Sequence, residues 1–236
     1  MNQMRQAYVI DNDFQLVRHR VLRNTYWLLA LSMIPTILGA WTGVQFNFFG
    51  AFFGIFGTHA LIGALVSLAI VYGFIFAIRA NQESGLGVVL MLAFTFYMGL
   101  LLSGIVGFAL QNFSNGAELI TIAFAGTASI LGVMATIATV SKRDFSALGQ
   151  VTAVGMIMCI IGSLLAIVFH MPLFYLFISV IVIGLSAAYI LYQVQQVVNG
   201  GERNYISAAL GIYISLFNIF VRLLQLLMIF AGGDRR

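Results

Sequence analysis

Charged residues are missing from two long stretches of the chain. None occurs in residues 24–78, a run of 55 residues, or in residues 145–201, a run of 57 residues. As one helix the first run would be about 80 Å long at ~1.5 Å per residue, against a bilayer hydrocarbon core of ~30 Å. Each run therefore predicts two membrane-spanning helices with a turn between them.

Polar and turn-forming residues divide the chain further. The first run contains a polar, glycine-bearing stretch at 45–50, and the second contains Pro172, which disfavours a helix continuing into it. Polar segments at 111–116 and 199–204 mark two more turns. The pattern predicts seven transmembrane helices, near residues 24–43, 53–78, 85–110, 119–140, 148–169, 173–197 and 205–231.

Composition supports a membrane protein of the all-α class. The chain has 236 residues, of which 61% are hydrophobic and 8% charged, whereas a soluble domain has roughly 25% charged residues. We expect a cytoplasmic N-terminal tail (1–23), one seven-helix transmembrane domain (24–231) in contact with the lipid bilayer, and a short extracytoplasmic C-terminal tail (232–236).

Lysine and arginine are unevenly divided between the two predicted sides. With the N-terminus inside, two of them, Arg235 and Arg236, fall on the outer side and eight on the cytoplasmic side. Cytoplasmic loops are enriched in Lys and Arg, so this bias predicts a cytoplasmic N-terminus. It also explains the net charge of +4 without a nucleic-acid partner. The eight residues are Arg5, Arg18, Arg20, Arg23, Arg79, Lys142, Arg143 and Arg203.

The residues that membrane enzymes need are largely missing. The only lysine, Lys142, lies in a predicted loop, which excludes a Schiff base within the bundle. The three histidines lack metal-ligand spacing, and no G-x-S-x-G, H-E-x-x-H or Walker A motif occurs. The single cysteine, Cys159, is interpreted as a packing residue. We expect neither an enzyme nor a cofactor or metal site.

Polar side chains form a stripe on each of the last two predicted helices. Each stripe covers an arc of about 80° at ~100° per residue, so neither is expected to face lipid. The two stripes are expected to face each other or to share a wet cavity. They consist of Ser186, Tyr189, Gln193 and Gln196 on the sixth helix, and of Ser207, Gly211, Ser215, Asn218, Arg222 and Gln225 on the seventh.

Arg222 needs a partner, because a charge near the middle of a spanning helix costs at least ~2.5 kcal/mol on insertion scales. No acidic residue lies inside a predicted span. The candidates are Asn218, Gln225, backbone carbonyls, outer-leaflet phosphates, or Glu118 at the outer end of the fourth helix. Arg222 is interpreted either as a brace that anchors the bundle or as part of a transport or regulatory path.

Several segments resemble the Bax inhibitor-1 family of seven-helix membrane proteins, and within it the bacterial YccA branch. The similarity covers nearly the whole chain and is carried by L-R-N-T-Y at 22–26, G-T-A at 126–128, K-R-D-F-S-A-L-G at 142–149, and above all G-G-E-R-N-Y-I at 200–206 with I-Y-I-S-L-F-N-I-F at 212–220. The resemblance implies six helices around a central seventh and a multi-pass protein of the bacterial inner membrane with a periplasmic C-terminus.

The resemblance also implies two possible functions. Calcium-permeable members carry one aspartate on each of the last two helices, and these align with Gln193 and Ser215 here. Neutral groups at both positions remove the proton-sensitive pair, and Arg222 would repel a divalent cation. The YccA branch is associated with modulation of the membrane protease FtsH. We therefore expect a modulator that binds an FtsH-type protease, with an ion leak (calcium or proton-coupled) lined by Gln193, Gln196, Ser215, Asn218, Arg222 and Gln225 as the alternative.

Overall fold

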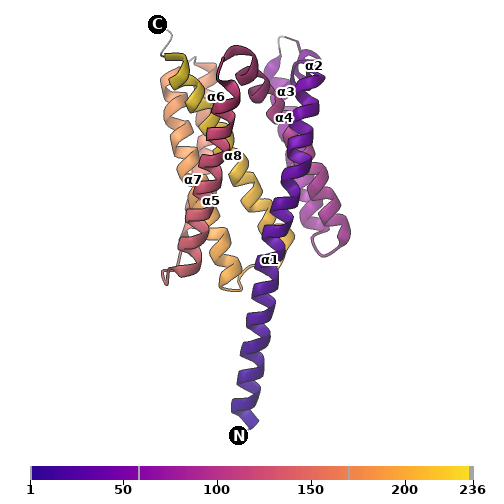
Figure 1. The fold of residues 1–236 in the computed structure, drawn as a ribbon, viewed down its shortest axis with the longest axis vertical. Coiled ribbons are helices and arrows are strands. Elements are labelled where there is room, and N and C mark those ends of the chain that lie inside the picture. The colour runs from indigo at the N-terminus through magenta and orange to yellow at the C-terminus, as the bar shows by residue number, and fades with distance from the viewer. Residues whose placement is uncertain (1, 58, 170, 234–236) are drawn as a thin grey trace.

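The computed structural model describes residues 2–57, 59–169 and 171–233, excluding the side chains of residues 2–18, 60, 61, 167, 168, 172 and 233. These ranges form eight helices and no strand (Figure 1). The helices are α1 (Asn2–Gln45), α2 (Phe48–Gly54), α3 (Ala60–Ala80), α4 (Gly85–Asn112), α5 (Gly116–Val140), α6 (Ser146–Val168), α7 (Pro172–Val198) and α8 (Tyr205–Gly233).

Seven of these helices are long and apolar enough to cross a membrane, as the sequence predicts. The spanning parts are His19–Gln45, Ile62–Ala80, Gly85–Asn112, Gly116–Val140, Ser146–Ala166, Leu173–Val198 and Tyr205–Gly232. Large apolar side chains point outward around the bundle, among them Trp27, Phe76, Leu173 and Phe177. Lipid is the solvent in which such a surface is stable.

The predicted second helix is wrong at its beginning. It was expected from residue 53, but α3 begins at Ala60, and the phenylalanine-rich segment before it forms the separate short helix α2. The chain changes direction on both sides of α2 through left-handed backbone conformations, at Asn47 (φ 47°) and Gly57 (φ 52°). Asn and Gly are the residues that tolerate this conformation, so they end the helices there.

The other predicted helices agree with the structure to within three residues at each end, apart from the first. α1 begins at Asn2, so its helix already includes residues 2–23 of the predicted tail. The turn expected at Pro172 is present, because α6 ends at Val168 and proline opens α7. Residues 234–236 of the predicted C-terminal tail lie outside the described residues.

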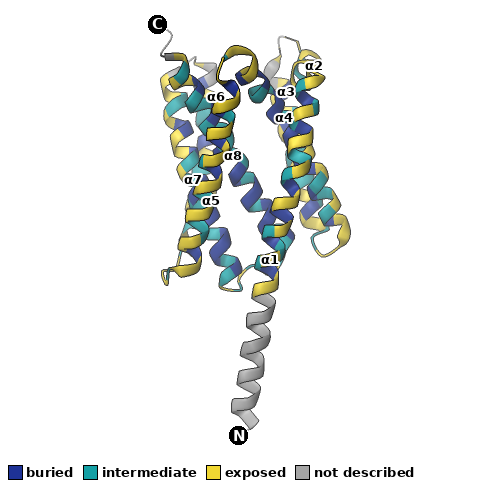
Figure 2. Ribbon diagram, in the orientation of Figure 1, coloured by how far each residue is buried: buried dark blue, intermediate teal, exposed yellow. Residues whose placement is uncertain are grey.

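α8 is the central helix, and it packs against α1, α3, α4, α5 and α7. The expected ring of six around a seventh is complete except at α6, which packs against α7 and not against α8. Figure 1 shows α8 running obliquely between a group formed by α1 to α4 and a group formed by α5 to α7. Its middle is buried on most sides (Figure 2), and Ile212, Tyr213 and Ile219 belong to the main hydrophobic core.

The closest helix packing joins α1 to α4 through small residues. A β-carbon at Gly99 would overlap the carbonyl oxygen of Thr36 and lie 3.0 Å from the amide nitrogen of Ala40. A β-carbon at Gly39 would in the same way overlap the carbonyl oxygen of Phe96. Only glycine lets the two backbones approach this closely, which is the usual role of small residues in membrane helices.

Candidate functional site

The polar stripes of α7 and α8 meet near Gly211. The Gln193 amide and the Tyr189 ring lie so close to Gly211 that a β-carbon there would collide with the amide nitrogen of Gln193. Ser215, one turn further along α8, is buried, and its hydroxyl donates to the Gly211 carbonyl oxygen over 3.1 Å. Gln193 and Ser215 thus share a neighbour, and both occupy a tightly packed contact between the two helices.

No carboxylate takes part in this contact. Within the described residues of the seven spans, the only acidic side chain is Glu118, in the first turn of α5. Gln193 is buried and can donate or accept hydrogen bonds, but it cannot change its charge with pH. The described part of this contact therefore contains no proton-sensitive pair.

Arg222 lies toward the other end of the same face of α8. Its Nη1 donates to the Tyr175 hydroxyl over 2.6 Å and to Gln225 Oε1 over 3.2 Å. The Tyr175 hydroxyl donates in turn to Gln225 Oε1, also over 3.2 Å. The guanidinium carbon is 5.1 Å from the centre of the Tyr175 ring, within the range of a cation–π contact.

The structure separates the candidate partners of Arg222. Gln225 is a partner, as expected for one of the candidates, and Tyr175 is a second partner that the sequence did not reveal. Glu118 is exposed and forms no ion pair with Arg222 within the described residues, so the structure gives this candidate no support. Asn218 is half-buried on the same stripe and makes no hydrogen bond to Arg222.

Gln196, which was expected to line the polar face with Gln193, packs on the turn that follows α7. It lies in the last turn of α7, where its side chain covers Gly201 in the following loop and its carbonyl oxygen accepts from the Gly201 and Glu202 amides over 2.8 and 3.0 Å. Its role in the described structure is to end α7 and shape the turn. Gln196 lies within α7, where periodicity places it on the stripe, but periodicity could not show that its side chain packs on the following turn.

Gln195, which the stripe missed, links α7 to the loop between α5 and α6. Its Oε1 accepts from the Phe145 amide over 2.7 Å, and its Nε2 donates to the Arg143 carbonyl oxygen over 2.5 Å. The side chain is buried, and both partners are backbone groups of the loop. The Gln195 side chain therefore satisfies two backbone groups of this loop that no secondary structure pairs.

Two further residues connect α8 to the helix group formed by α1 to α4. Tyr213 is 2% exposed, and its hydroxyl is hydrogen-bonded to the Thr36 hydroxyl of α1 at 2.8 Å. Asn204 caps α8 by accepting from the Ile206 amide over 2.9 Å, and its Nδ2 donates to the Gln82 carbonyl oxygen over 2.8 Å. Both contacts join segments more than 100 residues apart in sequence.

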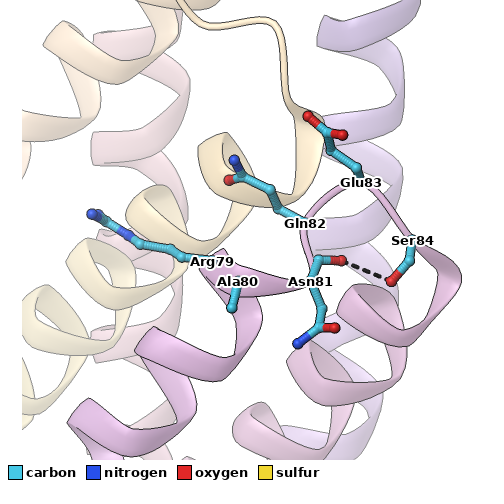
Figure 3. A pocket seen from close by; sticks show the side chains of 6 residues that line it. All are labelled: Arg79, Ala80, Asn81, Gln82, Glu83 and Ser84. Carbon is cyan, nitrogen blue, oxygen red and sulfur yellow. Dashed lines mark hydrogen bonds between the residues drawn. The ribbon is translucent and has the colours of Figure 1, made fainter.

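The loop between α3 and α4 borders an open hollow of about 250 Å³ (Figure 3). All its lining residues come from this one segment, from Arg79 to Ser84. Figure 3 shows Arg79 and Glu83 pointing apart, and the Ser84 hydroxyl donates to the Asn81 carbonyl oxygen over 3.0 Å. The two charged side chains therefore do not converge on a common point in the hollow. Among the described residues, no group of three His, Cys, Asp or Glu side chains is placed to hold a metal ion.

Comparison with protein families identifies the architecture. The model of the family described as inhibitor of apoptosis-promoting Bax1 matches residues 18–232. The chain belongs to the Bax inhibitor-1 family. The resemblance inferred from the sequence is thus confirmed, and with it a membrane protein of seven apolar helices.

Related proteins from three bacteria match nearly the whole of this chain. An uncharacterized protein of Neisseria meningitidis serogroup A is 37% identical over 219 residues, covering 92% of this chain and 94% of its own. An uncharacterized protein of Pseudomonas aeruginosa is 34% identical over 214 residues, covering 91% and 90%. The Escherichia coli K12 protein named modulator of FtsH protease YccA is 30% identical over 230 residues, covering 95% and 96%.

Proposed function

We propose that this protein is a non-catalytic, multi-pass protein of the bacterial inner membrane that binds an FtsH-type membrane protease and restrains its action on membrane substrates. The observation that carries the proposal is the similarity, over 95% of the chain, to the Escherichia coli protein named modulator of FtsH protease YccA. A second YccA sequence of that species, equally similar, is named an inner membrane protein.

The distribution of charge supports an orientation for this function. The loops between α3 and α4, α5 and α6, and α7 and α8 lie at one end of the bundle (Figure 1). That end carries Arg79, Lys142, Arg143 and Arg203, and the first span begins there next to Arg20 and Arg23. By the positive-inside rule this end faces the cytoplasm, and the C-terminus faces the periplasm.

Co-purification from native membranes tests the proposal. The chain, tagged at its C-terminus and extracted in a mild detergent, is expected to recover the FtsH-type protease, and an equally tagged unrelated seven-helix protein is not. Recovery should occur with active as well as inactivated protease, which separates a modulator from a mere substrate. Repeated absence of the protease, with other membrane complexes intact, would refute binding.

The restraining activity needs its own measurement. Overproduction of the chain is expected to lengthen the half-life of a short-lived membrane substrate of the protease at least twofold. The half-life of a soluble protein degraded by another protease serves as the control. An unchanged membrane-substrate half-life, despite co-purification, would reduce the proposal to binding without modulation.

A cation leak through α7 and α8 is the alternative function, and the same arrangement argues against it. Gln193 and Ser215 offer no titrating group, and the fixed charge of Arg222 on the same face of α8 opposes cations. Purified protein in dye-loaded liposomes should give no more calcium, potassium or chloride flux than empty liposomes between pH 5 and pH 8. The double variant Gln193→Asp with Ser215→Asp is the matched comparison, since it restores an acid pair. Wild-type flux above that of empty liposomes and equal to that of this variant would favour the leak.

A further inference from the structure

Arg222 uses only part of its hydrogen-bonding capacity within the protein. A guanidinium has five N–H donors. In the described structure Nη1 donates to Tyr175 and Gln225, while Nε and Nη2 donate to no protein group. Both partners are neutral, so the contacts hold the side chain in place without balancing its charge.

The charge has no acidic partner among the described residues. Glu118 lies at the correct end of the bundle but is exposed and unpaired with Arg222. An uncompensated guanidinium in the hydrocarbon region is unfavourable, and its free donors need a hydrogen-bond acceptor. An anion that can enter the bilayer would balance this charge and accept hydrogen bonds from these donors.

The side chain of Arg222 is directed toward the C-terminal end of α8. Gln225 lies three residues closer to that end, and Tyr175 lies three residues after Pro172, about 5 Å from the start of α7. α7 begins at the end of the bundle where α8 finishes (Figure 1). Arg222 thus extends from the interior toward the membrane surface, which is how long cationic side chains reach lipid headgroups.

The surroundings of the guanidinium are half open and apolar. Arg222, Tyr175 and Gln225 are each half-buried, so part of the cluster stays accessible. An exposed apolar side chain, Ile229 (45% exposed), lies on the same face of α8 as Arg222 and Gln225, one turn beyond Gln225. The site therefore combines free cationic donors with an apolar surface, and its occupant should carry an anionic head and hydrocarbon chains.

We propose that Arg222, Tyr175 and Gln225 bind the phosphate of a phospholipid in the leaflet that surrounds the C-terminal end of α8. The free Nε and Nη2 donors suit two oxygens of one phosphate, the geometry for which arginine is preferred over lysine. Tyr175 and Gln225 fix the guanidinium plane, and Ile229 contacts the acyl chains. This inference is independent of the protease partner proposed above.

Native mass spectrometry of the purified full chain in detergent micelles tests the site with three probes. Dioleoyl phosphatidylglycerol carries both phosphate and chains, dioleoylglycerol carries chains without phosphate, and inorganic phosphate carries no chains. We expect binding of dioleoyl phosphatidylglycerol at least tenfold tighter than that of dioleoylglycerol, with no displacement by millimolar inorganic phosphate. Equal binding of the two lipids would overturn the phosphate contact. Displacement by inorganic phosphate would overturn the lipid as occupant.

Variants locate the binding on the protein. Arg222→Gln should weaken binding of dioleoyl phosphatidylglycerol at least tenfold, and Arg222→Lys should weaken it by a smaller factor, because it keeps the charge and loses the two-pronged geometry. Arg79→Gln is the matched control, since Arg79 is exposed at the opposite end of the bundle, and it should change binding less than twofold. Each variant must elute as a single symmetrical species in gel filtration. Unchanged binding in both well-folded Arg222 variants would refute the site.

Discussion

Replacing Gln195 by leucine should release the loop between α5 and α6 from the end of α7. The substitution keeps a similar volume and removes the two hydrogen bonds that the amide makes to Arg143 and Phe145. A hydrogen bond contributes roughly 1 kcal/mol net, so we expect about 2 kcal/mol less protection of the loop, which corresponds to a factor of about 30 in the opening equilibrium. The Phe145 amide, which donates to Gln195 in the wild type, should exchange its hydrogen faster by that factor.

Hydrogen exchange measured by mass spectrometry with residue-level fragmentation checks this expectation. Gln196→Leu is the matched control, because the neighbouring glutamine makes no side-chain hydrogen bond to the loop and acts on the turn after α7 through its carbonyl oxygen. This control should leave exchange at Phe145 within about twofold of the wild type. If both variants gave the same rate at Phe145 as the wild type, the bonds of Gln195 would not be what orders the loop.

Substitutions at three further positions, Gly99, Tyr213 and Asn204, test the packing of the bundle by thermal unfolding of the purified protein in detergent. Gly99→Val should destabilise the protein by about 1–3 kcal/mol, because any β-carbon there meets the Thr36 carbonyl oxygen. Gly132→Val is the control and should change stability far less, because Gly132 has open space around it. Equal losses of stability in the two variants would contradict the close α1–α4 contact. Tyr213→Phe should cost about 1 kcal/mol through the lost bond to the Thr36 hydroxyl, and no measurable change would mean that this bond is not stabilising. Asn204→Ala should cost about 1 kcal/mol of stability, because it removes the cap of α8. Asn204→Asp should cost less, because it keeps the cap and loses only the donor to the α3–α4 loop. The reverse order would show that the loop contact dominates.

The spanning helices could be predicted because the thickness and apolar interior of the bilayer fix the length and composition of each spanning segment. Each crossing needs about 20 mainly apolar residues, and few charged residues are tolerated. The predicted helix at 205–231 accordingly matches α8, Tyr205–Gly233. The segment around α2 could not be predicted in this way, because a short apolar helix and the start of a spanning helix have the same hydropathy. What separates them is the left-handed backbone at Asn47 and Gly57.

The candidate site was only partly predictable, for a different reason. Helical periodicity places Gly211, Ser215, Arg222 and Gln225 on one face, and the structure keeps them there beside α7. Periodicity carries no information on the register between two helices. Periodicity could not predict the contact between Tyr175 and Arg222. A tyrosine near the start of a span is also typical of the membrane interface, so its position alone did not indicate a partner.

Gln195 shows the same limit within one helix turn. It lies outside the stripe that contains Gln193 and Gln196, so the pattern gave no reason to select it. Its importance comes from two backbone groups of a loop that is distant in sequence. A glutamine near the end of an otherwise apolar helix was the one signal available in the sequence.

The oblique course of α8 couples the two helix groups mechanically. In its first half α8 is hydrogen-bonded to α1 through Tyr213, and in its second half it is hydrogen-bonded to α7 through Arg222. A shear of one group past the other would have to tilt or slide this helix and strain both attachments together. A molecule that binds one helix group can therefore change the position of the other group through α8, without contacting that other group.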